Sequence, residues 1–252
     1  MKNFKDFIGQ AIYVVHALKG YEFHEKRVIE LFGENNLSFE FMADGDVSLI
    51  TADVLEKYFI PGIEAKLSKG ILSCTLNHIL CYEKIVAKQN RYGLVFENDP
   101  FFLTDFPKGI EKLIPEIEKL EGGFLISLEN STLKFPSYWQ TQDAKHLYRA
   151  RMGRMAGAYL INLEGATCIL EDLKHKKCDT VIDWWHNDLI ERGVVKMYWA
   201  HPPLVEQGSH NGYLNSTISS KPRSVTRRIS WVILKYFVYY FKRLFNEKRL
   251  VD

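Results

Sequence analysis

Apolar and polar positions in the first part of the chain alternate between strand-like and helix-like segments. Residues 10–18 form an apolar run with β-branched side chains, typical of a buried strand, and residues 37–42 alternate as a strand does. Between them, residues 21–33 have helical spacing and end at Gly33, a common helix stop. This strand–helix–strand order predicts the opening of a parallel α/β sheet.

The chain continues the same alternation to about residue 200. A helix is expected over 73–90 with Ser73 as its N-cap, and Pro115 is expected to interrupt a second helix over 107–123. The further expected elements are strands at 91–99, 124–129 and 194–199, a strand–turn–helix at 156–173, a helix at 180–193 closed by Gly193, and a polar irregular loop at 130–150. We therefore predict one α/β domain over residues 1–220, an open sheet flanked by helices.

Ligands of open α/β sheets bind beyond the carboxyl ends of the strands. Those positions here include His16, the triplet Glu97-Asn98-Asp99, the loop from about residue 130, and the segment after Trp199. The triplet stands before Pro100, which cannot continue a strand ladder, so a plain turn explains it. Acidic side chains at a strand end also suit a metal ion that binds phosphate. The triplet alone leaves both interpretations open.

Composition is that of a globular protein, at 46% hydrophobic and 25% charged residues. The four cysteines form no CxxC pair and no four-ligand zinc pattern, so we expect a reduced, cytoplasmic chain. The first ten residues hold no apolar run of the kind that a signal peptide needs. Cys74 and Cys81 lie seven apart on one stripe of the expected helix, which favours core packing for both.

The last 32 residues differ in charge from the rest. Residues 221–252 carry nine Lys/Arg and two acidic residues, whereas the net charge of the whole chain is only +2. Basic residues recur every seventh position, at Lys221, Arg228, Lys235, Lys242 and Arg249. The apolar run 229–241 between them is too short to span a bilayer. We predict a basic amphipathic helix that lies in a membrane interface, with an oligomerisation helix and a nucleic-acid arm as less favoured alternatives.

Three segments together resemble glycosyltransferase family 25, the family of lipooligosaccharide galactosyltransferases and collagen galactosyltransferases. They are LSKGILSCTLNHILCYEKIVAKQNRYGLVFENDPFF (67–102), GAYLINLEGATCIL (157–170) and DTVIDWWHNDLIERGVVKMYWAHPPLVEQ (179–207). In the family's first block, a Ser-His pair on a helix precedes an apolar strand that ends in Glu-Asp-Asp. This chain has Asn77 in place of that Ser and Asn98 in place of the middle acid, which puts metal affinity or activity in question.

The resemblance implies a GT-A-like fold with a Rossmann-like nucleotide-binding half. It also implies inverting transfer of a hexose, with galactose from UDP-galactose favoured, to a terminal sugar of lipopolysaccharide or lipooligosaccharide. UDP-glucose or UDP-N-acetylhexosamine is the alternative donor. A catalytically weak, membrane-docked glycan-binding protein is the alternative of another class. The expected setting is the inner, cytoplasmic membrane face of a Gram-negative bacterium, with residues 221–252 on the membrane and no nucleic-acid partner.

Candidate site residues follow from the chemistry of sugar transfer, which needs charge neutralisation at the diphosphate and a base at the acceptor hydroxyl. Divalent Mn²⁺ or Mg²⁺ is expected on carboxylate oxygens, with a late histidine completing the set. The expected metal ligands are Asp99, Glu97 and His210, with His201 as a rival to His210. The expected donor-binding residues are His16, Arg27, His78, Glu97 and Asn98. The expected general base is Asp183, with Asp188 as its rival.

Each of these residues also has a plain structural interpretation. His78 suits a core histidine equally well, and Arg27 suits a surface salt bridge better than a nucleotide contact. A solvated polar face would explain Asp183, which shares one helix face with Asp179 and Asn187. A second basic cluster, Arg149, Arg151 and Arg154, suits either the diphosphate or a solvated edge. Trp184 and Trp185 must point apart on a helix, so one is expected to be buried and the other could stack on a sugar.

Overall fold

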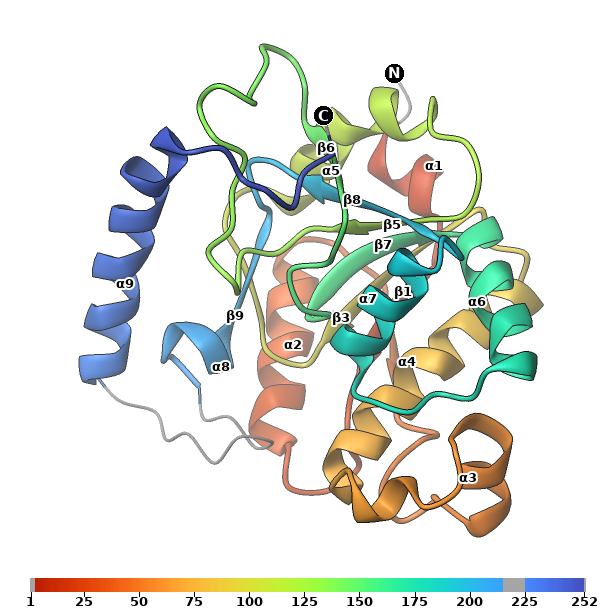
Figure 1. Ribbon diagram of the computed structural model, residues 1–252. Coiled ribbons are helices and arrows are strands. Elements are labelled where there is room, and N and C mark those ends of the chain that lie inside the picture. Colours follow the sequence, from red (N-terminus) through yellow and green to blue (C-terminus); the bar gives the residue numbers. More distant parts are fainter. Residues whose placement is uncertain (1–2, 215–224, 252) are drawn as a thin grey trace.

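A seven-stranded mixed sheet forms the centre of the protein, as a computed structural model that describes residues 3–214 and 225–251 shows (Figure 1). The strand order is β2-β1-β3-β7-β5-β8-β6. The strands are β1 (Ile12–Val15), β2 (Glu40–Met42), β3 (Tyr92–Glu97), β5 (Phe124–Ser127), β6 (Leu147–Ala150), β7 (Ala158–Asn162) and β8 (Lys196–Ala200). The predicted open α/β sheet flanked by helices is confirmed.

Strand direction divides the sheet into two halves. β1 runs parallel to both β2 and β3, in the arrangement predicted from the first strand–helix–strand. β7 is antiparallel to both β3 and β5, while β5 and β8 are parallel. The parallel half brings the carboxyl ends of β1 and β3 together, with Val15 opposite Glu97. A site at these strand ends therefore has the position expected for ligands of α/β sheets.

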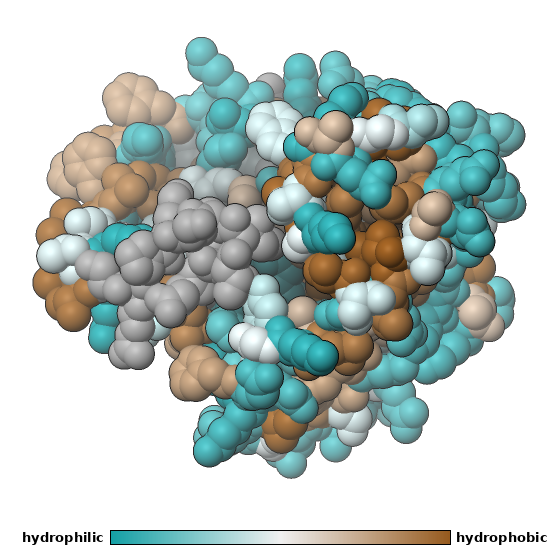
Figure 2. All heavy atoms as spheres, turned by 90° about the horizontal axis from the view of Figure 1, so that it is seen from below, coloured by the Kyte–Doolittle hydropathy of each residue, from teal (hydrophilic) through white to brown (hydrophobic). Residues whose placement is uncertain are grey.

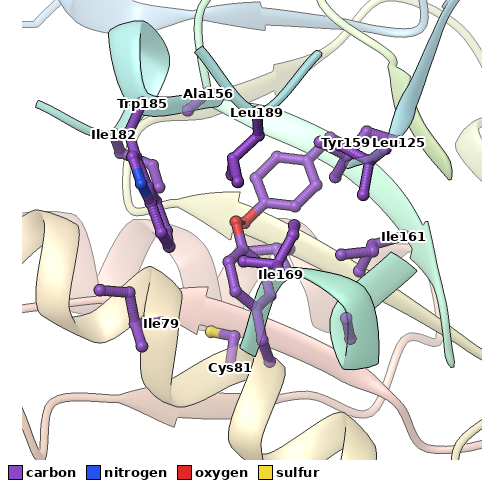
Figure 3. Packing of buried hydrophobic residues seen from close by; sticks show 14 of the residues in the cluster. Ile79, Cys81, Leu125, Ala156, Tyr159, Ile161, Ile169, Ile182, Trp185 and Leu189 are labelled. Carbon is purple, nitrogen blue, oxygen red and sulfur yellow. Dashed lines mark hydrogen bonds between the residues drawn. The ribbon is translucent and has the colours of Figure 1, made fainter. Parts of the chain in front are cut away.

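Helices cover both faces of the sheet because successive strand residues point to opposite sides. Ile12 and Val14 of β1 face α1 (Phe4–Ile8), α2 (Glu22–Glu34) and α5 (Phe106–Ile117). Tyr13 and Val15 face α3 (Ala52–Tyr58), α4 (Lys69–Ala87), α6 (Leu163–His175) and α7 (Ile182–Glu191). On this second face Tyr159 packs among Ile79, Trp185 and Leu189, so that β7, α4 and α7 share one core (Figure 3).

Several predicted boundaries are wrong. The long helix α4 starts one turn earlier than expected, with Ser68 and not Ser73 as N-cap, because the Ser68 hydroxyl accepts from the backbone of Ile71. Helix α2 continues past Gly33 to Glu34, and α5 continues through Pro115. Strand β6 lies inside the segment predicted to be irregular, since its residues pair with β8.

A small second sheet lies beside the main one, near the end of β3. It pairs β4 (Pro100–Phe102) with β9 (Val205–Gln207) in antiparallel register, Pro100 opposite Gln207. The short helix α8 (Gly208–Asn211) follows β9 directly. This pairing carries the 207–209 segment onto the acidic triplet.

The basic segment near the end of the chain does form a helix, α9 (Val225–Tyr240), followed by a 3-10 turn at Lys242–Leu244. The predicted seven-residue stripe is not one helical face: Lys221 lies outside the described residues, and Lys242 and Arg249 lie beyond α9. After the turn the chain returns to the body. Residues 249–251 then pair with the outer edge of β6, where Arg151 N donates to Arg249 O (2.7 Å) and Val251 N to Arg149 O (2.9 Å).

Candidate active site

A cavity of about 370 Å³ opens at the carboxyl ends of β1 and β3. Its walls come from the end of β1, the first turn of α2, the 46–48 turn, the first half of α4 and the end of β3. The predicted residues that line it are His16, Glu97, Asn98 and Asp99. The structure thus gathers residues from five elements at the strand ends where a ligand site was predicted.

Glu97 is fixed from both backbone and side chain. Its backbone N–H donates to Gly157 O on the neighbouring strand (2.9 Å), and its carboxylate accepts from the side-chain amide of Gln207 (3.0 Å). Gln207 fits only because residue 157 is a glycine, since a Cβ there would lie 2.2 Å from the Gln207 side chain. The end of β3, Gly157 and Gln207 therefore jointly fix the orientation of the Glu97 carboxylate.

Asp99 is buried, and the 208–209 segment holds it. Its carbonyl accepts from Gly208 N and its Oδ2 from Ser209 N, both at 2.8 Å. Its other oxygen, Oδ1, is buried and has no partner among the described residues. Because a buried carboxylate oxygen without a partner is costly, this oxygen is a ready ligand for a cation.

Burial and neighbouring acids raise the proton affinity of Glu97. Burial first, and then the charges of Asp99 and Asp183, together raise the pKa of Glu97 to about 8 against the opposing Gln207 hydrogen bond. Burial also raises the pKa of Asp183, although backbone hydrogen bonds, His78 and His210 oppose that effect. A concentration of negative charge that cannot be neutralised by solvent favours a cation, or cationic side chains, at this place.

His78 is a core histidine by position and still reaches the site. It is fully buried on α4, and its Nδ1 lies 2.8 Å from the Tyr159 hydroxyl. Its Nε2 lies 3.8 Å from Glu97 and has no hydrogen-bond partner within the described chain. Burial lowers the pKa of His78 to about 3, so the ring is neutral. The interpretation of His78 as a core histidine with one hydrogen-bonded nitrogen is confirmed, and its contact with a donor stays a prediction.

The two asparagines that depart from the family pattern have clear contacts. The fully buried Asn77 accepts from Gly45 N (2.8 Å) and donates to His16 O (3.4 Å), which ties the 43–46 turn to the end of β1. The Asn98 side chain donates to Nδ1 of His16 (3.1 Å), and burial lowers the pKa of that histidine. Asn98 is thus directed to His16.

Arg27 is not the surface salt bridge that was favoured from the sequence. Its guanidinium stacks 4.6 Å from the Phe101 ring and donates to Pro100 O (2.8 Å), and burial lowers its pKa. Arg27 thereby fixes the turn that follows the acidic triplet. One turn earlier on α2, His24 lines the cavity. Burial lowers the pKa of His24, and the charge of Asp99 opposes this effect. The sequence analysis missed His24, although its spacing of three from Arg27 places both on one helix face.

The two candidate bases, Asp183 and Asp188, both lie on α7 (Ile182–Glu191) but have different surroundings. Asp183 is half-buried and its charge raises the pKa of Glu97, whereas Asp188 pairs with Lys176 and Arg192 (both 2.8 Å). Neither carboxylate is among the residues that line the cavity. The two tryptophans point apart as predicted: Trp184 is 62% exposed and Trp185 is buried. Asp179 precedes the helix, so the expected face with Asp183 and Asn187 lacks it.

The other predicted cations and histidines fall into different surroundings. His210 on α8 is close enough to Asp183 to lower its pKa. His201 is buried between the rings of Phe135 and Tyr239, away from the cavity walls, which corrects its candidacy as a metal ligand. Arg154 is buried and donates to Ser127 O and Ala200 O, so it is no diphosphate contact.

Glu129 is a buried acid that the sequence analysis did not single out. It accepts from Gly157 N (2.8 Å) and from the Ser131 hydroxyl, and burial raises its pKa to about 8. Its only local signal was its place just after a buried strand, which many surface residues share. Gly157 thus connects Glu129 and Glu97 through its N–H and C=O groups.

The side chains that lie close enough together to bind one cation are not the three predicted metal ligands. Among the described residues, the cluster of three is Cys74, His78 and Glu97, whose ligand atoms lie within 4.8 Å of one another. Asp99 and His210 do not join this cluster. The set Glu97, Asp99 and His210 stays a prediction, supported for Asp99 by its unpartnered oxygen.

Comparison with known proteins gives consistent matches. The family model of Glycosyltransferase family 25 (LPS biosynthesis protein) matches residues 11–184. A Glycosyltransferase 25 family member of Aedes aegypti is 25% identical over 241 residues, 86% of this chain and 39% of that protein. A Probable inactive glycosyltransferase 25 family member 3 of Bos taurus is 30% identical over 120 residues, 47% of this chain and 20% of that protein. The Lipooligosaccharide biosynthesis protein lic2B of Haemophilus influenzae is 26% identical over 112 residues, 44% and 40% of the two chains. The chain therefore spans less than half the length of each of these relatives.

Proposed function

Because this chain belongs to glycosyltransferase family 25, we propose that it transfers a hexose from a UDP-sugar to a terminal sugar of lipopolysaccharide or lipooligosaccharide. The observation that carries the proposal is the pair Glu97 and Asp99 at the carboxyl end of β3, facing a cavity. Galactose is the favoured donor sugar and inversion the favoured stereochemistry, both on the family resemblance.

The residues of the cavity fit a divalent cation. Asp99 offers a buried, unpartnered oxygen, and Glu97 adds a second carboxylate within the same charged surroundings. Mn²⁺ or Mg²⁺ suits such oxygen ligands, and when bound would supply positive charge to the leaving diphosphate. Lys19 at the mouth and His24 in the wall are the cationic and polar groups placed for the diphosphate.

Asp183 is the proposed general base. Burial raises its pKa, which improves a carboxylate as an acceptor of the hydroxyl proton. The exposed Trp184 beside it offers an aromatic face to the acceptor sugar. Asp183→Asn is expected to lower kcat by about 100-fold or more, in line with general base catalysis, while Asp188→Asn stays within about 10-fold of the wild type. The reverse order would assign the base to Asp188.

The first test is release of UDP from a panel of UDP-sugars, with and without Mn²⁺. Hydrolysis or transfer of one sugar that depends on Mn²⁺ supports the proposal and identifies the donor. Asp99→Asn should lower that rate by about 100-fold or more, because one cation ligand is lost. The asparagine can still accept from Ser209 N, so the fold should persist. Equal rates in both proteins would remove Asp99 from the metal site.

A glycan-binding protein with weak catalysis is the second candidate. It is favoured by Asn98, which binds His16 where the family has an acid, and by the likeness to a relative named as probably inactive. The two candidates separate on Asp99→Asn: a transferase loses metal-dependent turnover, whereas a binding protein keeps its affinity for the glycan. Asn98→Asp tests the same point, since a transferase limited by Asn98 should gain activity.

Helix α9 supports a further part of the proposal, attachment to an anionic membrane surface. No helix in the described part of the chain is long and apolar enough to cross a bilayer. The side of α9 that faces the body combines polar and apolar contacts: Arg227 donates to Ser209 O (2.7 Å), Lys235 pairs with Glu206 (2.8 Å), and Val238 packs with Leu133 and Phe135. Its outer side carries exposed apolar residues, namely Ile229, Val232, Ile233, Tyr236, Phe237, Tyr240 and Phe241. These side chains form the apolar left edge of the view in Figure 2.

This orientation fits a bilayer because cations flank the apolar face. Arg228 lies near one end, and Lys242 follows the other end. Apolar side chains in the interface with Lys/Arg near anionic headgroups are the two contributions that hold an interfacial helix. The proposed location is accordingly the cytoplasmic face of a Gram-negative inner membrane. We also propose that the glycosyltransferase domain ends at residue 220 and that residues 221–252 form the membrane-binding tail. This boundary falls within residues 215–224, which lie outside the described residues.

Sedimentation with vesicles tests this attachment. Phe237→Ser is expected to lower partitioning onto anionic vesicles by about 10-fold or more, since a buried Phe contributes roughly 1.5–3 kcal/mol. Phe23→Ser is the matched control, a phenylalanine on α2 that is 63% exposed against 49% for Phe237. If neither substitution changes sedimentation, or if Phe237→Ser instead dissociates a dimer, the face does not bind a membrane. Point substitutions are preferred to truncation because residues 241–251 hold the 136–140 loop.

A further inference from the structure

We propose that Cys74, His78 and Glu97 form a binding site for a soft divalent transition-metal ion such as Zn²⁺, which shares Glu97 with the proposed Asp99 site but differs from it in its other ligands. Cys74 and His78 are four residues apart on α4, so both side chains lie on one helix face. That face meets the end of β3, where Glu97 projects. The Sγ, Nε2 and carboxylate oxygen atoms lie within 4.8 Å of one another, near enough for one ion to join them after small side-chain shifts.

His78 is the strongest indication of a ligand. Its ring is fully buried, and its Nε2 points toward Glu97 with no hydrogen-bond partner in the described chain. A buried nitrogen of this kind costs stability unless something binds it. A cation suits this nitrogen, because its neighbours are a sulfur and a carboxylate oxygen, which are metal ligands, and neither forms a hydrogen bond with it in the described chain.

The other side of the His78 ring is held as metal-bound histidines are held. Its Nδ1 lies 2.8 Å from the Tyr159 hydroxyl. The Tyr82 hydroxyl continues the chain of hydrogen bonds: it lies 2.7 Å from the Tyr159 hydroxyl and 2.6 Å from Nε2 of His186. In one direction along this chain, Nδ1–H donates to Tyr159, Tyr159 to Tyr82 and Tyr82 to His186. Each group is then satisfied, and Nε2 of His78 keeps its lone pair for a metal.

The donor set selects the class of metal. Thiolate, imidazole and carboxylate together suit Zn²⁺ or Co²⁺, whereas Mn²⁺ and Mg²⁺ prefer oxygen alone. Cys74 and Glu97 line the cavity, so a fourth position on the ion faces solvent or ligand. In the metal-free protein, burial and the nearby acids hold the pKa of the Cys74 thiol above its ordinary value. Binding therefore replaces the thiol proton by the metal and releases it to solvent, together with the Glu97 proton at pH values below about 8.

Occupation of this site has a consequence that rests on the proposed function. Glu97 belongs both to this cluster and to the pair with Asp99, and one carboxylate cannot serve the two ions unchanged. We infer that Zn²⁺ inhibits the Mn²⁺-dependent transfer by withdrawing Glu97 from the donor cavity. Inhibition should require Cys74.

Titration of the full chain with Co²⁺ tests the site without any need for enzymatic activity. A thiolate ligand gives Co²⁺ a sulfur-to-metal charge-transfer band in the near ultraviolet, which Zn²⁺ should abolish by displacement. The wild type should show one equivalent of this band. Cys74→Ser should remove it, whereas Cys168→Ser, a half-buried cysteine on α6, and Asp99→Asn should keep it. Absence of the band in the wild type, or its persistence in Cys74→Ser, would overturn the proposal.

Two further variants separate a ligand from a structural role. Tyr159→Phe keeps the shape of the ring and removes the partner of His78, so Zn²⁺ affinity should fall by about 10–100-fold. His78→Gln should lower it at least as much, with near-ultraviolet circular dichroism as the check on folding. An unchanged affinity in folded His78→Gln contradicts the site. If the cobalt band forms but Zn²⁺ inhibits wild type and Cys74→Ser transfer equally, the site stands and the sharing of Glu97 is refuted.

Discussion

Helices α4 and α9 are the two longest helices of the described chain, and they are attached to the body in opposite ways. Ten of the 19 residues of α4 are buried, including Ile79, Tyr82 and Ile85. One of the 16 residues of α9, Val238, is buried, and the side toward the body is held by Arg227, Lys235 and a small apolar cluster of Val238 with Leu133 and Phe135. Burial of apolar surface thus stabilises α4, while polar contacts and this small cluster hold α9 and leave its other apolar side chains exposed. A helix can therefore belong to a core or present an apolar surface for binding.

The largest expected effect on stability comes from a substitution in the buried face of α4. Ile79 is fully buried between α4 and α7 in the core shown in Figure 3. Ile79→Ala should lower the free energy of unfolding by about 2–5 kcal/mol, through lost burial and the cavity left behind. Urea unfolding followed by circular dichroism measures it. A loss below about 1 kcal/mol would mean that the α4 interface repacks easily.

The buried acid Glu129 gives a pH-dependent test. Glu129 has a raised pKa of about 8, so the folded state favours its neutral form. Its contribution to stability is fully present below its unfolded pKa near 4.5 and is lost as the pH rises toward 8. Between pH 5.5 and 8 the wild type should lose about 1–3 kcal/mol relative to Glu129→Gln. Parallel pH profiles of unfolding for the two proteins would contradict this assignment.

Lys235 tests how α9 is held. Burial would raise the pKa of Glu206, but hydrogen bonds from Lys235 and others outweigh burial and lower it. Lys235→Met should cost about 1–2 kcal/mol at pH 7, between the values for exposed and buried ion pairs. This contribution is present above the unfolded pKa of Glu206 and is lost as the pH falls through the folded one, so the two proteins should converge in acid. Convergence at high pH instead would reverse the sign of the argument.

The smallest expected effect is on the outer side of α9. Ile233 is 64% exposed, and Ile233→Ala should change stability by no more than about 0.5 kcal/mol. It makes the same chemical change as Ile79→Ala, so the pair isolates burial as the cause of the difference. Urea unfolding under identical conditions compares them. A loss of 2 kcal/mol at Ile233 would show that this face is already covered in solution, for example by a second copy.

The features predicted correctly from the sequence are those with local signals. The apolar run of β3, the triplet at its end and the opposed directions of Trp184 and Trp185 depend on neighbouring residues, and the structure confirms them. The contacts that complete the site join distant segments: Gln207 reaches Glu97 across 110 positions, and Asn77 reaches His16 across 61. No periodicity reports such pairs. The same reason explains β6, which is a strand because β8 lies beside it.

The orientation of α9 could not be predicted from its pattern either. A seven-residue repeat of cations indicates an amphipathic helix, but it does not say which side meets the body. Here Glu206 and the Ser209 carbonyl attract the cationic side inward, and these acceptors lie at least 18 residues away in the sequence. Stripes of charge therefore predict a helix more reliably than they predict its outward face.

The pairing of residues 249–251 with β6 protects the protein against self-assembly. An edge strand with free N–H and C=O groups is a template on which other chains can add strands and form aggregates. The backbone groups of Arg149 and Arg151 on this edge already form hydrogen bonds with residues 249–251, and Leu250 is buried against the core. At the opposite edge, β2 is only three residues long and carries Glu40 bound to Lys84. Removal of residues 249–251, which lie far from the candidate active site, is therefore expected to increase the rate at which the protein aggregates.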